Sequence, residues 1–493
     1  MKKKVMVIGA GIAGLSAGVY AQKCGFDVTI LESHSLPGGI CTAWKRKGYL
    51  FEGGMHWLAG SSASQPMNKM WRHIGALNDD VKISYCEPFV EYNHDGTPIR
   101  IYRDVDSTER HMIELSPADE KEIKNFCNNI RKMKKLVEPI TDIKGVKVTK
   151  KNPRSLSALL SLLPVISVMG QYSKVSVAEY ATRFKHEGLR EMFSAMPGNE
   201  QGIAMLIMTA GALARGDGGF PESGSLPFAG RIADTFTSLD GRLLLNTHAD
   251  KVIIDNGKAV GVVANGEEIP ADAVIITSDT MAIERYFDIP LRASWLEVMR
   301  KVTEPTTAVF VSLGINADLT SYPERPLIKL KSPIKISDIT IGSLLLANYA
   351  SDPHYSPAGK TALTAQLPGD TYDFWKKLKE SGKYAEEKQR IGNEVIAEIS
   401  AAIPEVEGNV EVCDVATPLT YERYCGNWKG SWMSAITPNT KFKPYPSVIK
   451  GLDGVYFAGQ RMMPPGGIPP AMMTARTAVQ HLCRDTGTLF ISE

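Results

Sequence analysis

A glycine-rich motif near the N-terminus constrains the fold of this chain more than any other feature: Gly9-Ala10-Gly11-Ile12-Ala13-Gly14. Residues 4–8 before it, apolar after Lys4, predict a buried strand, and residues 12–24 after it predict a helix that ends at Gly25. Residues 26–33 predict a second strand that ends on an acidic residue. Strand, helix and strand in this order indicate a β-α-β unit of a doubly wound sheet.

The three glycines of the motif suit a turn that binds phosphate. Gly9 permits the tight turn, Gly11 lets the backbone approach a pyrophosphate, and Gly14 lets helix and strand pack closely. The helix N-terminus then faces the phosphates, and Glu32 is placed to accept hydrogen bonds from a ribose hydroxyl. We therefore predict a dinucleotide site. The alternatives are that these glycines only pack a helix on a sheet, or that they belong to a secretory signal.

Size and composition narrow the classes of function. The 493 residues are enough for two or three lobes, and 43% are hydrophobic and 22% charged. A net charge of +2 gives no signature of nucleic-acid binding. The seven cysteines are scattered and the nine histidines form no ligand-spaced cluster. We therefore expect a reducing, intracellular setting and no metal site.

The order of predicted elements indicates one lobe assembled from separated pieces. Residues from about 75 to 205 are helical and rich in Lys and Glu, whereas residues 242–277 alternate as strands do. A last buried strand, GLDGVYFAG, lies near the C-terminus. The sequence predicts a discontinuous Rossmann-like domain made of residues 1–74, 206–288 and 430–493, with a substrate domain inserted as residues 75–205 and 289–429.

The segment GQRMMPPGGIPPAMMTAR, residues 459–476, combines loop residues with good helix formers. Gly466-Gly467 let the backbone come very close to a partner, and Pro469-Pro470 suit the first turn of a helix, where no amide donor is lost. We expect this helix start to point at a bound ligand. The alternative is a Pro-Gly loop that only ends a domain.

Further glycine-rich segments carry a resemblance to a known family. Gly38-Gly39 follow Glu32 closely, Gly53-Gly54 come later in an extended stretch, and GGFPESGSLPFAG begins at residue 218. With GLDGVYFAGQRMMPPGGIPPAMMTA they resemble the FAD-dependent oxidoreductases of the phytoene desaturase, carotenoid isomerase and retinol saturase group, which are distantly similar to the monoamine oxidases. The resemblance implies FAD as the cofactor and an α/β fold: a three-layer, discontinuous FAD-binding domain with an inserted α+β substrate domain.

The resemblance also implies a set of cofactor contacts. Gly54, Met55 and His56 are expected near the flavin ring. Several relatives have an arginine where this chain has Ile40, so Lys45 or Arg46 is the candidate to contact a phosphate instead. Carried over by position, the implied cofactor-binding residues are Gly9, Gly11, Ile12, Ala13, Gly14, Glu32, Ser33, Gly38, Gly39, Thr42, Lys45, Gly54, Met55, His56, Val252, Ser278, Gly459, Gln460, Gly467 and Ile468.

A flavin would explain the glycine-proline segment near the C-terminus. The isoalloxazine ring gathers negative charge around N1 and its C2 carbonyl when reduced, and a helix N-terminus presents free amides and a positive dipole end there. No second G-x-G-x-x-G motif follows a strand, so no separate NAD(P)H site is expected. Reoxidation would then be by oxygen, a quinone or a diffusible carrier.

The resemblance also implies the function: desaturation, or in reverse saturation, of a carbon–carbon bond in a lipophilic polyene or isoprenoid-like substrate, by hydride transfer at flavin N5. The alternatives are a non-redox double-bond isomerase, an amine oxidase, and a lipid carrier that binds no flavin. His56 and Tyr421 are the candidate catalytic residues, although both could be structural. The sequence does not indicate an oligomeric state.

Residues 147–169 suggest contact with a membrane surface. Lys147, Lys150, Lys151 and Arg154 precede an apolar run, residues 156–169, that is too short to span a bilayer. A basic flank on an apolar patch suits interfacial attachment, and the alternative is a buried helical hairpin. The expected location is cytoplasmic, with peripheral attachment to the inner face of the membrane as an option.

Overall fold

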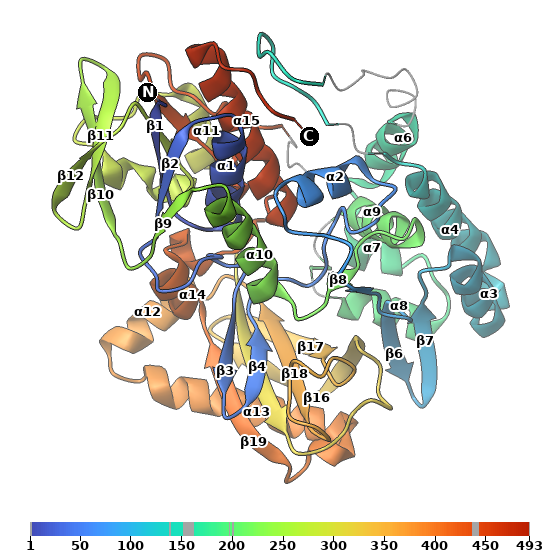
Figure 1. Cartoon of the computed structure of the whole chain (residues 1–493). Helices are drawn as coiled ribbons and strands as arrows, with labels where there is room; N and C mark the ends of the chain where they lie inside the picture. The colour runs from blue at the N-terminus through green and yellow to red at the C-terminus, as the bar shows by residue number, and fades with distance from the viewer. Residues whose placement is uncertain are drawn as a thin grey trace.

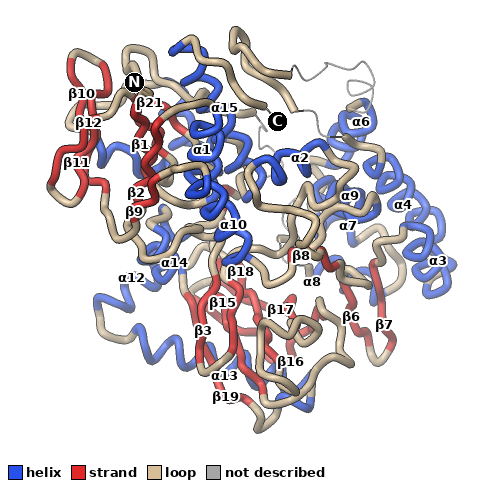
Figure 2. The backbone as a smooth tube through the Cα atoms, in the orientation of Figure 1, coloured by secondary structure: helices blue, strands red, loops and turns tan. Residues whose placement is uncertain are grey.

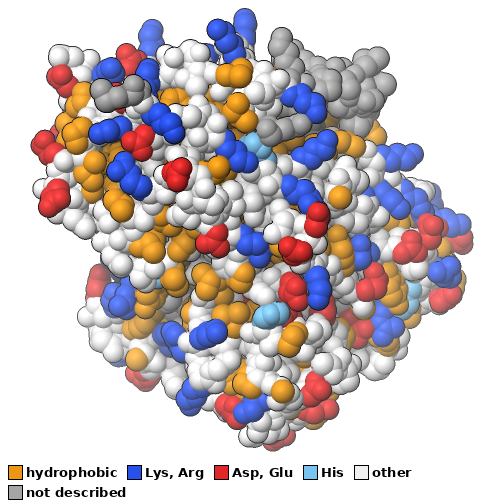
Figure 3. Space-filling view, viewed as in Figure 1, with side chains coloured by type: hydrophobic (Ala, Val, Ile, Leu, Met, Phe, Trp, Pro, Cys, Tyr) orange, Lys and Arg blue, Asp and Glu red, His pale blue; other side chains and the backbone are white. Residues whose placement is uncertain are grey.

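The computed structural model describes residues 2–137, 140–150, 162–196, 198–199, 202–435 and 443–492. Figure 1 shows three groups of elements: a parallel sheet with its helices at the upper left, a group of helices at the right, and a larger sheet below. On the face seen in Figure 3, basic and acidic side chains are intermixed over most of the surface. That face therefore offers no broad basic patch for nucleic acid.

The parallel sheet is built from three separated stretches of chain. Its strand order is β21 (Val455–Phe457), β13 (Ala273–Ile276), β1 (Lys4–Ile8), β2 (Asp27–Leu31) and β9 (Arg242–Leu244), and every neighbouring pair is parallel. The chain leaves β1 through α1 (Ile12–Lys23) to reach β2, while β13 pairs with the other edge of β1. Ligands bind at such a switch point, beyond the carboxyl ends of the strands.

Both faces of the parallel sheet are covered, which gives three layers. Val5 and Val7 pack with α1, α10 (Ser225–Ser238) and α15 (Ile468–Thr486). Met6 and Ile8 point the other way, against a three-stranded sheet of β10 (Ala249–Asp255), β11 (Lys258–Ala264) and β12 (Glu267–Pro270). Figure 2 shows this small sheet and α1 on opposite sides of β1 and β2. The predicted three-layer, Rossmann-like α/β fold is confirmed.

A mixed seven-stranded sheet joins the two inserted segments. Its order is β19 (Val410–Ala416), β15 (Ala308–Ile315), β18 (Thr361–Pro368), β17 (Ile339–Asn348), β16 (Pro326–Ile336), β6 (Val90–His94) and β7 (Thr97–Ile101). Pairing of β6 with β16, Glu91 opposite Pro326, links the first insertion to the second. Helix α13 (Tyr384–Ala402) packs against one face of the sheet. The two inserted segments therefore contribute strands to the same sheet.

The helices at the right share their own hydrophobic core. They are α3 (Val105–Leu115), α4 (Glu120–Lys134), α6 (Leu163–Tyr172), α7 (Val177–Ala181), α8 (Glu187–Ala195) and α9 (Ile203–Ala214). The predicted boundary between residues 205 and 206 falls inside α9, and the proposed domain boundaries stay a prediction.

The segment predicted to contact a membrane lies only partly within the described residues, because residues 151–161 are outside them. Leu163 and Ile166 on α6 are 59% and 65% exposed. Within the described ranges, every helix is too short or too polar to cross a bilayer. Peripheral contact stays a prediction. Sedimentation with liposomes would test it: a Leu163→Ser, Ile166→Ser variant should lose binding, and unchanged binding would contradict this prediction.

Candidate cofactor and substrate site

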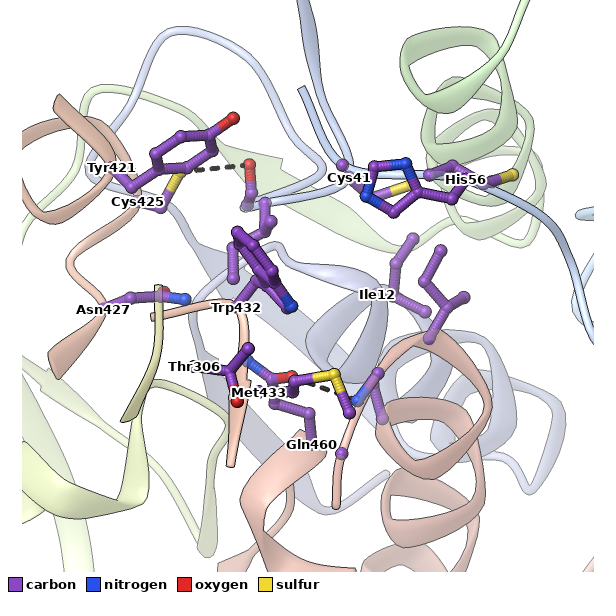
Figure 4. Close-up of a pocket in the computed structure, with 18 of the residues that line it drawn as sticks. Ile12, Cys41, His56, Thr306, Tyr421, Cys425, Asn427, Trp432, Met433 and Gln460 are labelled. Atoms are coloured by element: carbon purple, nitrogen blue, oxygen red, sulfur yellow. Dashed lines mark hydrogen bonds between the residues drawn. The ribbon is translucent and has the colours of Figure 1, made fainter. Parts of the chain in front are cut away.

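One large cavity opens where the parallel sheet meets the two inserted groups. Its volume is about 1500 Å³, above the roughly 300–1,000 Å³ typical of a pocket for one small molecule. Its glycine-rich half lies at the carboxyl ends of β1, β2 and β13, and its other half is apolar. In Figure 4, Ile12 and Gln460 lie on the side of the parallel-sheet lobe, while His56 and Trp432 extend into the space from other segments. The cavity therefore has room for two ligands side by side.

The turn after β1 has the geometry that phosphate binding requires. A Cβ at Gly14 would lie 1.8 Å from the carbonyl oxygen of Gly9, so only glycine fits there. Helix α1 begins with Gly11 as its N-cap, and Gly11, Ile12 and Ala13 line the cavity. The first amides of a helix have no acceptor in a preceding turn, so they can donate to an anion in the cavity.

Glu32 lies at the end of β2, beside this turn. Its carboxylate accepts hydrogen bonds from the amides of Ala10, at 2.7 Å, and His34, at 2.8 Å. These bonds hold the carboxylate at the edge of the cavity, which it lines together with Ser33. The position suits the predicted contact with a ribose.

The second glycine pair packs directly against the first turn. The amide of Gly38 donates to the carbonyl oxygen of Ala10 at 2.8 Å. A Cβ at Gly39 would lie 3.2 Å from the Cα of Gly11. The two loops therefore form one continuous edge of the cavity, a contact that spacing along the sequence does not reveal.

The N-terminus of α15 lies at the cavity, where the sequence predicted a helix aimed at a ligand. Gly467 donates its amide hydrogen to the Gln460 side chain at 3.1 Å, and Pro469 and Pro470 have none to donate. Ile468 therefore supplies the first-turn amide that is left for a ligand. A Cβ at Gly467 would meet nothing within 4 Å, so the backbone here borders open space.

A buried polar atom at the end of β13 also indicates that the cavity holds a polar ligand. The Ser278 hydroxyl is buried and has no hydrogen-bond partner among the described residues, yet the residue lines the cavity. Buried polar groups are nearly always paired, so a ligand atom at this place would satisfy it. This half of the cavity therefore fits a flavin dinucleotide: the α1 N-terminus suits its phosphates, Glu32 suits a ribose, and the α15 N-terminus suits the negatively charged edge of the reduced ring.

Most of the residues predicted to contact the cofactor meet at this cavity. Gly14 lies behind the turn, Lys45 is exposed on the strand β3 (Ala43–Arg46), and Val252 is 1% exposed in the core below the sheet. These three do not line the cavity, and their contact with the cofactor stays a prediction. Those that do line it are Gly9, Gly11, Ile12, Ala13, Glu32, Ser33, Gly38, Gly39, Thr42, Gly54, Met55, His56, Ser278, Gly459, Gln460, Gly467 and Ile468.

A buried glutamate that the sequence analysis missed holds the loop expected to lie near the ring. Glu52, at the end of β4 (Tyr49–Glu52), is 4% exposed. Its carboxylate accepts from the amides of Gly54 at 3.0 Å and Met55 at 3.2 Å, from the Ser225 amide at 3.0 Å and from the Tyr355 hydroxyl at 3.1 Å. An acidic residue ending an apolar strand just before two glycines was the signal for this role.

Tyr421 also helps to hold the loop that contains Gly53 and Gly54. Its hydroxyl donates to the carbonyl oxygen of Gly53 at 2.9 Å, and the residue is 4% exposed. Burial raises the pKa of this phenol well above 10.0, so it stays protonated. Its hydrogen is already engaged, and this geometry supports a positioning role better than proton transfer, for which Tyr421 remains only a candidate.

The other half of the cavity has an apolar wall. Its aromatic members include Trp57, Phe89 and Phe310, and Trp432 projects into the space in Figure 4. Helix α9 contributes a row of small and apolar residues, Met205, Leu206, Met208, Ala212 and Leu213, and the seven-stranded sheet adds Leu327, Leu345 and Ala347. Such a wall suits a long apolar ligand and excludes water from it.

His56 is an uncharged side chain between the two halves. Burial, reinforced by the nearby Arg325 cation, lowers the pKa of this imidazole to about 4. Its ring centroid lies 6.4 Å from that of Phe310. Near neutral pH the ring is a neutral hydrogen-bonding group, so it is a weak base there.

The lowered pKa of His56 predicts a pH dependence of stability. An unfolded chain protonates this histidine near 6.5, whereas the folded protein protonates it near 4. The unfolded state therefore binds more protons between these values, and stability should fall by up to about 3 kcal/mol as the pH decreases through this window. Thermal unfolding at pH 5 and pH 7 would measure it. His56→Gln should reduce the difference, His248→Gln at an exposed site should not, and equal behaviour of both variants would contradict the assignment.

Comparison with known proteins identifies the family. The chain belongs to the flavin-containing amine oxidoreductase family, whose model matches residues 12–483. It is therefore a flavin-dependent oxidoreductase, and its cofactor is FAD. The fit of the glycine-rich half to a dinucleotide agrees with this membership.

Three relatives match most of the chain. It is 24% identical to the lycopene-forming phytoene desaturase of Paracoccus sp. (strain N81106 / MBIC 01143), over 98% of both chains. It is 22% identical to the all-trans-retinol 13,14-reductase of Danio rerio, over 86% of this chain and 76% of the relative. It is also 22% identical to the chloroplastic prolycopene isomerase 1 of an Oncidium hybrid cultivar, over 98% and 84%. The resemblance drawn from the sequence is confirmed.

Solved structures confirm the fold. An oxidoreductase from Methanosarcina mazei has a TM-score of 0.60 at 16% identity, and the match covers 97% of this chain and 100% of that one. A putrescine oxidase variant has a TM-score of 0.60 at 14% identity, covering 98% and 99%. At these identities the likeness concerns architecture alone.

Proposed function

We propose that this protein adds or removes hydrogen across a carbon–carbon bond of a lipophilic, polyene-like substrate, with FAD as the redox partner. The observation that carries the proposal is a continuous cavity of about 1500 Å³. One half is glycine-rich and suits a dinucleotide, and the other half is apolar. The relatives support this substrate class, since by their names they act on phytoene, all-trans-retinol and prolycopene.

The chemistry divides between the cofactor and the chain. Bound FAD supplies hydride transfer at flavin N5. The chain holds the substrate: the apolar wall excludes water, and the loop of Gly54 to His56, fixed by Glu52 and Tyr421, borders the reacting space. The α15 N-terminus stabilises negative charge next to it. Hydride transfer requires a close, fixed approach between a substrate carbon and the flavin. The neighbouring carbon would lose or gain a proton at the same time, and the neutral His56 imidazole, which lines the cavity, is the candidate group to accept or donate it.

The alternatives differ in what the cavity would have to accept. An amine substrate is disfavoured because Arg325 places a positive charge in the apolar half. A flavin-free lipid carrier is disfavoured because the glycine-rich half is intact. A non-redox isomerase would use the same cavity, and the prolycopene isomerase relative keeps it as the second candidate.

Anaerobic absorption spectroscopy of the purified holoprotein tests the proposal. Phytoene, lycopene, retinol and unsaturated fatty acids would be added in detergent while the flavin spectrum is followed. Bleaching by one compound identifies a desaturase. Reoxidation of chemically reduced flavin by an unsaturated compound identifies a saturase. Change of double-bond geometry without change of redox state would favour the isomerase, and no effect in any arm would contradict the proposed substrate class.

A further inference from the structure

Arg325 is a cation within the cavity that the proposed reaction does not use. It directly precedes β16 and lines the cavity, close to His56 and Tyr349. Its Nη2 donates to the carbonyl oxygen of His56 at 3.1 Å. Among the described residues, no carboxylate lies within 4.0 Å of the guanidinium, whereas Arg46, which also lines the cavity, pairs with Asp414 at 2.8 Å. Arg325 therefore has no ion-pair partner within 4.0 Å among the described residues.

Among the described residues, the titratable groups around Arg325 form no ion pair with it. Burial lowers the pKa of His56 to about 4 and raises the pKa of the Cys86 thiol to about 11. Burial likewise raises the pKa of Tyr349. All three are uncharged near neutral pH. Glu324, the adjacent residue, accepts a hydrogen bond from Ser351 at 2.6 Å and lies beyond ion-pair distance of the guanidinium, and its negative charge contributes to the raised pKa of Arg325.

An unpaired charge inside a protein lowers the stability of the fold. A bound ligand of opposite charge would offset this cost. The guanidinium has five donors in a planar fork, which matches the two oxygens of a carboxylate better than any neutral group. The backbone bond to His56 occupies one part of this fork and fixes its orientation. Arg325 also contacts the Cys86 thiol, and among the described residues its guanidinium makes no hydrogen bond to an oxygen other than this carbonyl, while the residue lines the cavity.

We infer that Arg325 binds a carboxylate at one end of the substrate, which is therefore a lipophilic acid rather than a hydrocarbon or an alcohol. This inference rests on the proposed function, which gives the substrate a long hydrocarbon part. It adds that the substrate ends in a carboxylate. The apolar wall of α9 would contact the hydrocarbon part of the substrate. Because Arg325 would hold the carboxylate in place, it would also determine which carbon–carbon bond lies beside the flavin. A short, free carboxylate would use the same fork but would leave that wall uncovered.

Matched acid and alcohol probes test the inference on the holoprotein. All-trans-retinoic acid and retinol form one pair, and oleic acid and oleyl alcohol form another, with binding followed by the flavin spectrum and tryptophan fluorescence. The acid of at least one pair should bind at least about tenfold more tightly than its alcohol. Arg325→Met should remove that preference, and Arg325→Lys should retain part of it. Arg72→Met, at an arginine that pairs with Asp79 outside the cavity lining, should leave it unchanged.

The outcomes separate this inference from the proposed reaction. Equal binding of acid and alcohol in both pairs, or no binding of either, would overturn the inference even if a neutral polyene bleaches the flavin. A preference for acids that depends on Arg325 would support it even if no probe is oxidised or reduced. If hexanoate competes for binding as well as the long acids do, the statement that the acid is lipophilic is overturned. Flavin content and melting temperature show whether the Arg325→Met variant is folded. If it is not, the acid preference of the wild-type protein and its partial loss in Arg325→Lys decide the test.

Discussion

Replacing Gly11 with valine is expected to give a folded protein that retains less than about a tenth of the wild-type flavin. A Cβ at this position meets only Gly38 and Gly39, at 3.9 and 4.0 Å, so the protein itself has room for it. The new side chain would occupy the space in front of the α1 N-terminus, where overpacking by about 1–3 kcal/mol weakens binding roughly tenfold to a hundredfold. Flavin absorbance relative to protein absorbance measures the loss.

Two further glycines make the test specific. Gly14→Ala puts its methyl group 1.8 Å from the Gly9 carbonyl oxygen, so this variant should lose the fold as well as the flavin. Gly230 in α10 has nothing within 4 Å of an added Cβ and lies outside the cavity lining, so Gly230→Ala should keep both. Normal flavin content in Gly11→Val would mean that the α1 N-terminus does not bind the cofactor.

Local patterns explain how much of this fold could be predicted. The β1-α1-β2 unit lies within 28 residues, from Lys4 to Leu31, and its turn depends on nearby backbone atoms. Both faces of β1 are buried, and its residues Val5 to Ile8 are all apolar, as expected for a central parallel strand. The α15 start could be located for the same reason, because Gly467 and the two prolines act on their own backbone.

Contacts between distant residues account for what the sequence did not predict. The bond from Gly38 to Ala10 and the pairing of β6 with β16 depend on the tertiary arrangement, so no periodicity reports them. Arg325 stands in a segment of ordinary composition, and only the fold brings it beside His56. Lys45 shows the converse: the sequence offers Lys45 and Arg46 as neighbouring cations, and in the structure both are exposed near the end of β3 but only Arg46 lines the cavity.

The buried ion pair between Asp279 and Arg461 is expected to have the largest effect on stability. The two side chains are 3% and 1% exposed, and Arg461 donates to both carboxylate oxygens, at 2.8 and 2.9 Å. Asp279 also accepts from the Trp428 amide at 2.9 Å, and Arg461 reaches the Ser431 carbonyl oxygen at 3.3 Å. The pair therefore ties the end of β13 to the segment before Trp432, which is one wall of the cavity.

Asp279→Leu should destabilise the protein by about 3–5 kcal/mol, because it leaves the Arg461 charge buried without its partner. Flavin release on heating measures the change, since both residues border the cofactor half. Glu284→Gln, which breaks the more exposed pair with Arg300, is the matched control and should cost less than about 1 kcal/mol. The double variant Asp279→Leu, Arg461→Met should recover part of the loss, since apolar pairs can replace buried ion pairs. If the single variant melts like the control, the pair contributes nothing to holding this wall, and the cavity must be shaped by its apolar packing alone.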